Sequence, residues 1–177
     1  NTARKINGLK AIHPKDSSRF HFEIEESTQG WKSKVSDTNS ETKIKNIEYK
    51  SDLGERGLKV ESKNLSKNKF SEIYVETFFP EVILGLKGKK RKDFFHYDYI
   101  SCPIIYSGQN IKSEIENISE KNISLKFFVK YWGENDELIK ISSDEFKMKT
   151  KEIKRISWNV PSTDTNPIGQ IGLNIFS

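Results

Sequence analysis

Two tryptophans stand beside planar polar side chains at the expected ends of strands. Trp132 is followed closely by Asn135 and Asp136, and Trp31 follows Gln29 across a turn. A sugar ring has an apolar C–H face that stacks on an indole, and it has hydroxyl groups that amide and carboxylate side chains bind. These five residues are therefore candidates for a non-catalytic sugar-binding site.

The tryptophans also fit a hydrophobic core. Trp158 alternates in phase with the apolar residues around it, which is typical of the buried face of a strand. Trp31 opens an expected strand and fits the same interpretation. Trp132 lies off the face that carries Leu125 to Tyr131, so for this residue both interpretations stay open.

The sequence carries few traces of enzyme chemistry. Its single cysteine, Cys102, lies in an apolar run that suits a small buried side chain and not an activated thiolate. His96 is six positions away, which is ~20 Å along a strand. No GxSxG, GxxxxGK[ST], GxGxxG or HExxH motif occurs. We therefore expect no enzymatic activity. One cysteine and three scattered histidines also exclude a disulfide framework and a zinc cluster.

We expect no cofactor, with a structural calcium ion as the one alternative. Calcium prefers oxygen ligands, which Glu23 and Glu25 supply in one loop and residues 134–137 supply in another. The spacing of an EF-hand is absent, and ordinary solvated loops account for the same residues.

The chain has 30 Lys and Arg against 25 Asp and Glu, for a formal net charge of +5. Most lysines alternate with acidic or small polar residues, as on solvated strand faces, so we expect no nucleic-acid partner. The cluster at 87–92 predicts an exposed loop, and contact with an anionic partner is the alternative.

Because no run of ~18 apolar residues occurs, we expect no membrane span. We expect a soluble protein, either cytoplasmic or secreted after removal of a signal peptide.

Apolar residues alternate with period two along much of the chain, and helical spacing is hard to find. Many short strands with turn residues between them are typical of an antiparallel β-sandwich or barrel. We expect a single domain over 19–177, after a lead-in segment over 1–18. Two strands, 111–116 and 125–131, are joined through a polar turn and predict a hairpin.

Other local expectations follow from the same alternation and from the turn residues. A strand is expected over 20–24, a turn at 29–30, a turn over 52–57 before a short strand at 58–60, a strand over 73–79, a loop over 133–137, and strands over 156–160 and 171–175.

The order of short motifs resembles a galactose-binding-like β-sandwich of the carbohydrate-binding-module type. More specifically, it resembles the accessory domain that follows the catalytic domain of bacterial ADP-ribosylglycohydrolase-like proteins. The motifs span Arg19 to Ile175 and are Phe20-His21-Phe22, Gln29-Gly30-Trp31, Gly57-Leu58-Lys59-Val60, Glu76-Thr77-Phe78-Phe79-Pro80, Tyr99 to Pro103, Tyr106-Ser107-Gly108-Gln109, Trp158-Asn159-Val160-Pro161 and Pro167 to Leu173.

The resemblance implies a jelly-roll sandwich that acts as a non-catalytic accessory module. Such a module would bind carbohydrate, or a sugar-containing ligand, for an attached glycohydrolase. The alternative is a structural or interaction domain that packs on a catalytic partner without binding a glycan. In the resembled domains a further strand of the Tyr-Leu-Asp type usually follows, whereas this sequence ends at Ser177. Either that strand is absent, which leaves an open edge for self-association, or the chain is a piece of a longer polypeptide.

Overall fold

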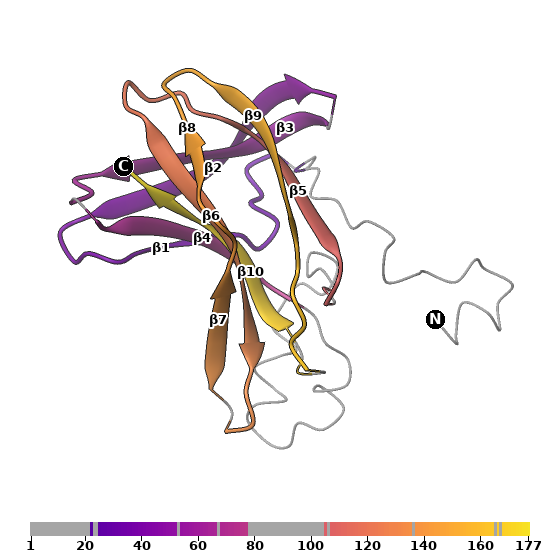
Figure 1. The fold of residues 1–177 in the computed structure, drawn as a ribbon. Coiled ribbons are helices and arrows are strands. Elements are labelled where there is room, and N and C mark those ends of the chain that lie inside the picture. Colours follow the sequence, from indigo (N-terminus) through magenta and orange to yellow (C-terminus); the bar gives the residue numbers. More distant parts are fainter. Residues whose placement is uncertain are drawn as a thin grey trace, which may run out of the picture.

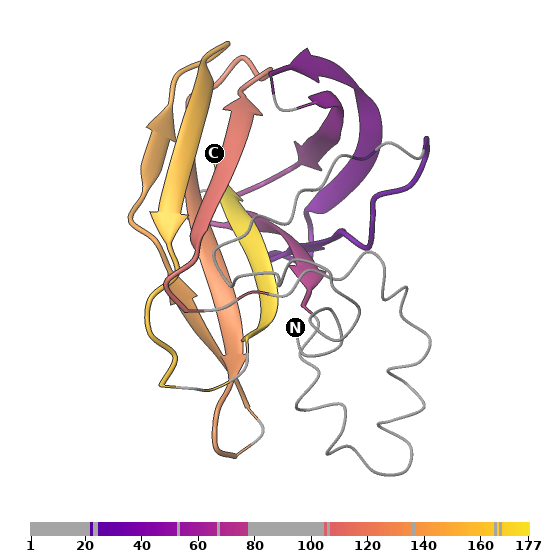
Figure 2. The same cartoon turned by 90° about the vertical axis from the view of Figure 1, so that its right-hand side faces the viewer.

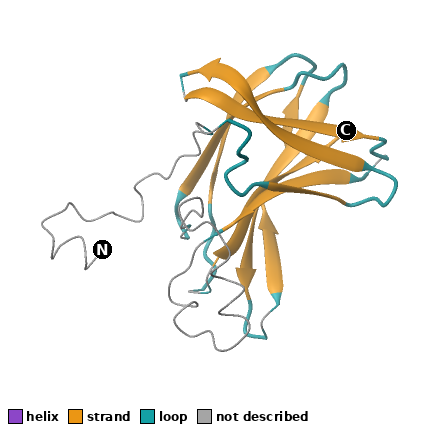
Figure 3. Ribbon diagram, turned by 180° about the vertical axis from the view of Figure 1, so that it is seen from behind, coloured by secondary structure: helices purple, strands orange, loops and turns teal. Residues whose placement is uncertain are grey.

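The computed structural model describes residues 22, 25–52, 54–66, 68–77, 105, 107–135, 137–164, 166 and 168–177. Regular structure in these residues consists of β-strands (Figure 3). The described strands are β1 (Lys32–Val35), β2 (Glu41–Ser51), β3 (Gly54–Lys63), β4 (Phe70–Glu76), β5 (Asn110–Glu116), β6 (Ile123–Trp132), β7 (Leu138–Ser142), β8 (Phe146–Met148), β9 (Ile153–Asn159) and β10 (Ile168–Phe176). Among the described residues, no helix is long and apolar enough to cross a membrane.

The largest sheet has the strand order β1-β4-β10-β6-β7, and β8 pairs with the other end of β6. All of its pairings are antiparallel. Figure 1 shows the strand direction turning from nearly upright at β7 to nearly horizontal at β1, which is the strong twist expected of such a sheet. We call this the large sheet.

Two further antiparallel pairs, β2–β3 and β5–β9, complete the described strands. Figure 2 shows β5 and β9 in a layer in front of β6 and β10. Alternate residues of the facing strands meet between the layers, because successive side chains of a strand point to opposite faces. Two buried clusters fill this core: Ile73, Leu125, Phe127, Met148, Ile156 and Leu173 in one, and Val75, Val129, Val160, Ile168 and Ile171 in the other.

The antiparallel β-sandwich predicted from the sequence is therefore confirmed. The inward positions of two central strands are also as predicted. Ile73, Val75 and Thr77 are buried on and just after β4, and Leu125, Phe127 and Val129 are buried on β6. The turn before Trp31 is present, with the Trp31 N–H donating to the Thr28 carbonyl at 3.0 Å. The loop over 133–137 closes between β6 and β7, where the Gly133 N–H donates to the Glu137 carbonyl at 2.8 Å.

The predicted hairpin between 111–116 and 125–131 is wrong. β5 pairs with β9, from Asn110 opposite Asn159 to Glu116 opposite Ile153, whereas β6 pairs with β10, β7 and β8. The polar segment after β5 therefore carries the chain from one layer to the other. Because the chain crosses between the layers, β5 and β6 pack against the same core from opposite sides, and both bury their apolar faces there.

Asn117 holds this crossing in place. It is 3% exposed. Its amide group donates to the carbonyls of Lys121 (2.8 Å) and Lys149 (2.9 Å). Its carbonyl oxygen accepts from the N–H and the hydroxyl of Ser119 at 3.1 and 2.7 Å. The predicted tight hairpin turn is therefore absent at this point, and a loop that is hydrogen-bonded to the segment before β9 takes its place.

Two local predictions need correction. The strand expected over 20–24 is not supported at Phe22, which is buried but has a left-handed φ of 53°. The turn expected over 52–57 is shorter, because β3 already begins at Gly54 and pairs from there with β2. The lead-in segment 1–18, the cluster at 87–92, His96 and Cys102 lie outside the described residues.

Candidate functional site

The face of the large sheet that points away from β5 and β9 carries aromatic and charged side chains. We call it the outer face. The register places Glu72 and Tyr74 of β4 beside Gly172 and Asn174 of β10. The outward positions of the strands are Lys32 and Lys34 on β1, Phe70, Glu72, Tyr74 and Glu76 on β4, Gln170, Gly172, Asn174 and Phe176 on β10, Lys126, Phe128, Lys130 and Trp132 on β6, and Leu138, Lys140 and Ser142 on β7.

A charged cluster occupies the centre of the outer face. Lys130 Nζ lies 2.6 Å from Glu72 Oε1, and Lys140 Nζ lies 2.7 Å from Glu72 Oε2. Lys140 Nζ also donates to Asn174 Oδ1 at 3.1 Å. The Glu72 side chain is 6% exposed, whereas those of Lys130 and Lys140 are 17% and 27% exposed. One carboxylate is therefore shared by two partly exposed ammonium groups.

The cluster covers aromatic rings. Phe128 is fully buried although it points away from the core, and Lys140 Nζ lies 4.1 Å from the centroid of its ring. Lys130 Nζ lies 5.1 Å from the same centroid and 5.6 Å from that of Tyr74. An ammonium group over an aromatic face is attracted by the ring quadrupole. The lysine side chains thus lie across the sheet and shield Phe128.

The pKa values reflect this shared arrangement. Burial by itself would raise the pKa of Glu72, but the hydrogen bonds from Lys130 and Lys140 outweigh it and hold the pKa below its ordinary value. Burial lowers the pKa of Lys140 most, and the positive charges of Lys130 and Lys34 add to this, so that together they outweigh the raising effect of Glu72. The ion pair alone would raise the pKa of Lys140, but the burial of its ammonium group reverses the direction.

Trp132 lies at the end of the outer face nearest the β6–β7 loop, where it is opposite Leu138 in the register. Its half-buried indole packs over Gly169, since a Cβ atom there would lie 2.7 Å from Nε1. Nε1 is buried and has no hydrogen-bond partner among the described residues. Asn135 is exposed in the adjoining loop, with its N–H donating to the Glu137 carboxylate at 2.9 Å. Asp136 lies outside the described residues.

The other two predicted site residues, Trp31 and Gln29, lie away from this end of the outer face. Trp31 packs against both buried clusters. The side-chain oxygen of Gln29 accepts a hydrogen bond from the Phe22 N–H at 3.1 Å, so it holds the chain before β1. The structure therefore brings Trp132 and Asn135 to one end of the outer face, and it places Trp31 and Gln29 elsewhere.

The calcium candidates belong to the same segment before β1. Glu25 is exposed, and Glu23 lies outside the described residues. Nearby, the carbonyls of Phe22 and Ser27 accept hydrogen bonds from the Asn46 amide at 2.7 and 2.8 Å. The described residues contain no group of three or more His, Cys, Asp and Glu side chains that could hold a metal ion.

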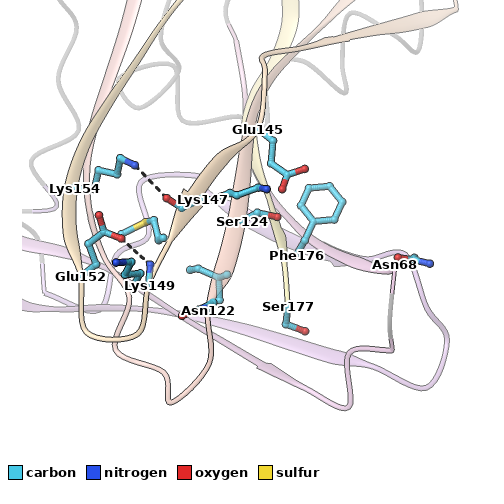
Figure 4. A pocket seen from close by; sticks show the side chains of 12 residues that line it. Asn68, Asn122, Ser124, Glu145, Lys147, Lys149, Glu152, Lys154, Phe176 and Ser177 are labelled. Carbon is cyan, nitrogen blue, oxygen red and sulfur yellow. Dashed lines mark hydrogen bonds between the residues drawn. The ribbon is translucent and has the colours of Figure 1, made fainter.

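An open groove adjoins the outer face at β8 (Figure 4). Its volume is ≈ 730 Å³. Phe176 is the only aromatic residue among its described lining residues. Its polar groups are partly occupied, since the Lys149 N–H donates to the Glu152 carboxylate at 2.6 Å and Lys154 Nζ donates to the Lys147 carbonyl at 3.1 Å. The groove thus offers less stacking surface than the outer face.

Comparison with solved structures identifies the fold. A structure from work on the promiscuous specificity of carbohydrate-binding modules of the β-sandwich superfamily matches with a TM-score of 0.64 at 18% identity, over 92% of this chain and 56% of that chain. A xylan-binding domain from Paenibacillus barcinonensis matches with a TM-score of 0.50 at 9% identity, over 88% of this chain and 90% of that domain. This chain has the β-sandwich fold of carbohydrate-binding modules. The match covers little more than half the length of the first of these two solved chains. No protein-family model and no curated protein sequence matches the chain.

The sequence assigned no role to Glu72, Lys130, Lys140 or Asn174. Its alternation placed Lys130 on the face opposite Leu125, as the structure has it. The sequence signal for Glu72 was its position out of phase with Ile73 and Val75, on the face of the strand that also carries Glu76. The partners of Glu72 could not be found by spacing, because they lie 58 and 68 residues away along the chain.

Proposed function

We propose that this chain is a non-catalytic carbohydrate-binding module and that the outer face of its large sheet binds the glycan. The supporting observation is that aromatic rings and hydrogen-bonding groups alternate across this one face. Tyr74 and Trp132 are half-buried rings at its centre and its end. Gln170 lies between them in the register, with its side-chain carbonyl oxygen buried and without a hydrogen-bond partner among the described residues.

The chemistry of sugar recognition requires both kinds of group. The C–H face of a sugar stacks on an aromatic ring, and polar side chains bind the hydroxyl groups and fix the orientation of the ligand. Antiparallel strands give a rigid support for such groups, because their spacing is fixed by the backbone hydrogen bonds. Trp132 and Asn135 belong to this proposed site, and Asp136 adjoins them in the sequence.

Affinity electrophoresis in gels that contain soluble xylan, glucan, galactan or polygalacturonate tests the proposal. Trp132→Ala and Tyr74→Ala should each lose most of the retardation of the wild type in any gel that retards it. Tyr49→Ala is the matched control, because Tyr49 is a half-buried aromatic residue on β2, outside the large sheet. Unchanged retardation of both outer-face variants would exclude this face. No retardation of the wild type in any gel would favour the structural or interaction domain.

A more specific proposal is that the module belongs to a longer protein and binds glycan for an attached glycohydrolase of the ADP-ribosylglycohydrolase-like type. Its support is the motif order from Phe20 to Leu173 together with the carbohydrate-binding-module fold. Sequencing the gene on both sides of the segment that encodes this chain tests it. A glycohydrolase in the same reading frame is the expected result. A reading frame that encodes this domain alone would overturn it.

A further inference from the structure

Positive charge exceeds negative charge on the outer face. The register of β8 adds Lys147 to this face, because Lys147 lies opposite the outward Ser124 of β6, and Glu145 lies beside Lys126. With these two residues, lysines outnumber glutamates on the outer face by six to three. The lysines are Lys32, Lys34, Lys126, Lys130, Lys140 and Lys147, and the glutamates are Glu72, Glu76 and Glu145.

The three glutamates do not neutralise the face. Lys32 pairs with Glu76 at 3.3 Å, and Lys126 lies 4.0 Å from Glu145. Glu72 is shared between two lysines. Lys34 lies opposite Glu72 in the register, is exposed, and forms no ion pair within the described part of the chain. It is close enough for its charge to lower the pKa of Lys140. At the centre of the outer face, positive charges therefore outnumber negative charges.

The cluster also shows which anion these cations accommodate. Lys130 and Lys140 approach the two oxygens of a single carboxylate from neighbouring strands, with one ammonium group at each oxygen. Charge-assisted hydrogen bonds of this kind are stronger than those between neutral groups. A sugar that carries a carboxylate presents the same group to Lys34 and Lys140, and its ring has a C–H face for Tyr74.

We infer that the outer face binds polysaccharides built from carboxylated sugars, with Lys34 and Lys140 contacting the carboxylate. This inference rests on the proposed function and names the class of glycan for that same site. It requires no covalent step, and the anion is held by electrostatic attraction and hydrogen bonds. Binding should therefore weaken as salt is added, since partly exposed charges are screened.

Isothermal titration of the full chain at low ionic strength tests the inference with three polymers. These are polygalacturonate, the same polymer after reduction of its carboxyl groups, and dextran sulfate. We expect polygalacturonate to bind about tenfold more tightly than its reduced form, and more tightly than dextran sulfate. Lys34→Gln should weaken polygalacturonate binding about fivefold, because a partly exposed ion pair contributes on the order of 1 kcal/mol. Lys34→Arg should retain most of the affinity.

Lys112→Gln is the matched control. Lys112 is exposed on β5, in the opposite layer, and forms no ion pair among the described residues. Its substitution should leave the affinity unchanged. Equal binding of polygalacturonate and its reduced form would overturn the inference and leave the proposed function standing. Equal or tighter binding of dextran sulfate would overturn it in favour of unselective attraction of polyanions. Binding of none of the three polymers would overturn the inference, and retardation of the wild type by the neutral glycans in the affinity gels would then decide the proposed function.

Discussion

Lys140 reaches from β7 across β6 and β10 to Glu72 on β4, where its Nζ atom lies 2.7 Å from the carboxylate. The contact joins an edge strand to a strand three places away on the same face. Along its path Lys140 covers the ring of Phe128 and reaches the side chain of Asn174. A single charged side chain thus ties together four strands of the large sheet.

Removal of the carboxylate should destabilise the protein. Glu72→Ala leaves two partly buried ammonium groups without their shared anion, and we expect a loss of about 2–4 kcal/mol in the free energy of unfolding. Urea denaturation followed by tryptophan fluorescence measures it. Glu61→Ala is the control, because the pair of Glu61 with Lys59 is well exposed, and it should cost less than about 1 kcal/mol. Equal losses for the two variants would contradict a special role for Glu72.

The same carboxylate should make stability depend on pH in the acid range. The pKa of Glu72 is lower in the folded protein than its ordinary value of 4.5. The folded state therefore binds fewer protons than the unfolded state, and the stabilisation is present above pH 4.5 and is lost as the pH falls through the folded pKa. The stability advantage of the wild type over Glu72→Gln should shrink in that window. A difference that stays constant from pH 6 downward to the acid transition would contradict the prediction.

Gly172 should tolerate no side chain. A Cβ atom there would lie 2.5 Å from Cζ of Phe128 and would collide with the carbonyl oxygen of Ile73 on the paired strand. Because that oxygen belongs to the backbone of a central strand, it cannot move aside cheaply. We expect Gly172→Ala to cost at least about 3 kcal/mol or to prevent folding. Gly57→Ala, where the nearest atom is Cβ of Tyr49 at 3.5 Å, should change stability by less than about 1 kcal/mol.

Asn117→Ala should destabilise the crossing between the layers. The substitution removes the buried amide that donates to the carbonyls of Lys121 and Lys149. Losing these two hydrogen bonds to partly buried carbonyls should cost about 1–3 kcal/mol in total, at about 0.5–1.5 kcal/mol for each. Thermal unfolding followed by circular dichroism measures the loss, with Asn39→Ala in an exposed turn as the reference. A melting temperature equal to that of Asn39→Ala would show that the loop does not depend on these bonds.

Much of the β-structure could be predicted because alternation is a local property. Residues two apart on a strand share a face wherever the strand lies, so the inward positions of β4 and β6 could be read from the sequence alone. The outward positions of Phe128, Lys130 and Trp132 were readable for the same reason. The turn at Gln29 and Gly30 and the loop over 133–137 follow from the conformational preferences of their residues.

Pairing between strands could not be predicted in this way. The segments 111–116 and 125–131 are neighbours in sequence and have hairpin-like alternation, yet each buries its apolar face in a different layer. Which strand lies beside which depends on how the whole core packs, and that preference is spread over contacts between distant residues. β5 and β6 follow each other in the sequence but are not hydrogen-bonded to each other.

The sequence by itself determined an all-β chain, the two faces of its central strands, and aromatic residues set at strand ends. Only the tertiary structure decided that Trp132 shares a face with Glu72 and Lys140, and that Trp31 and Gln29 do not. The physical reason is that a strand assigns its own side chains to a face by its period of two. The neighbours of those side chains across the sheet are set by hydrogen-bonded registers between segments far apart in the chain.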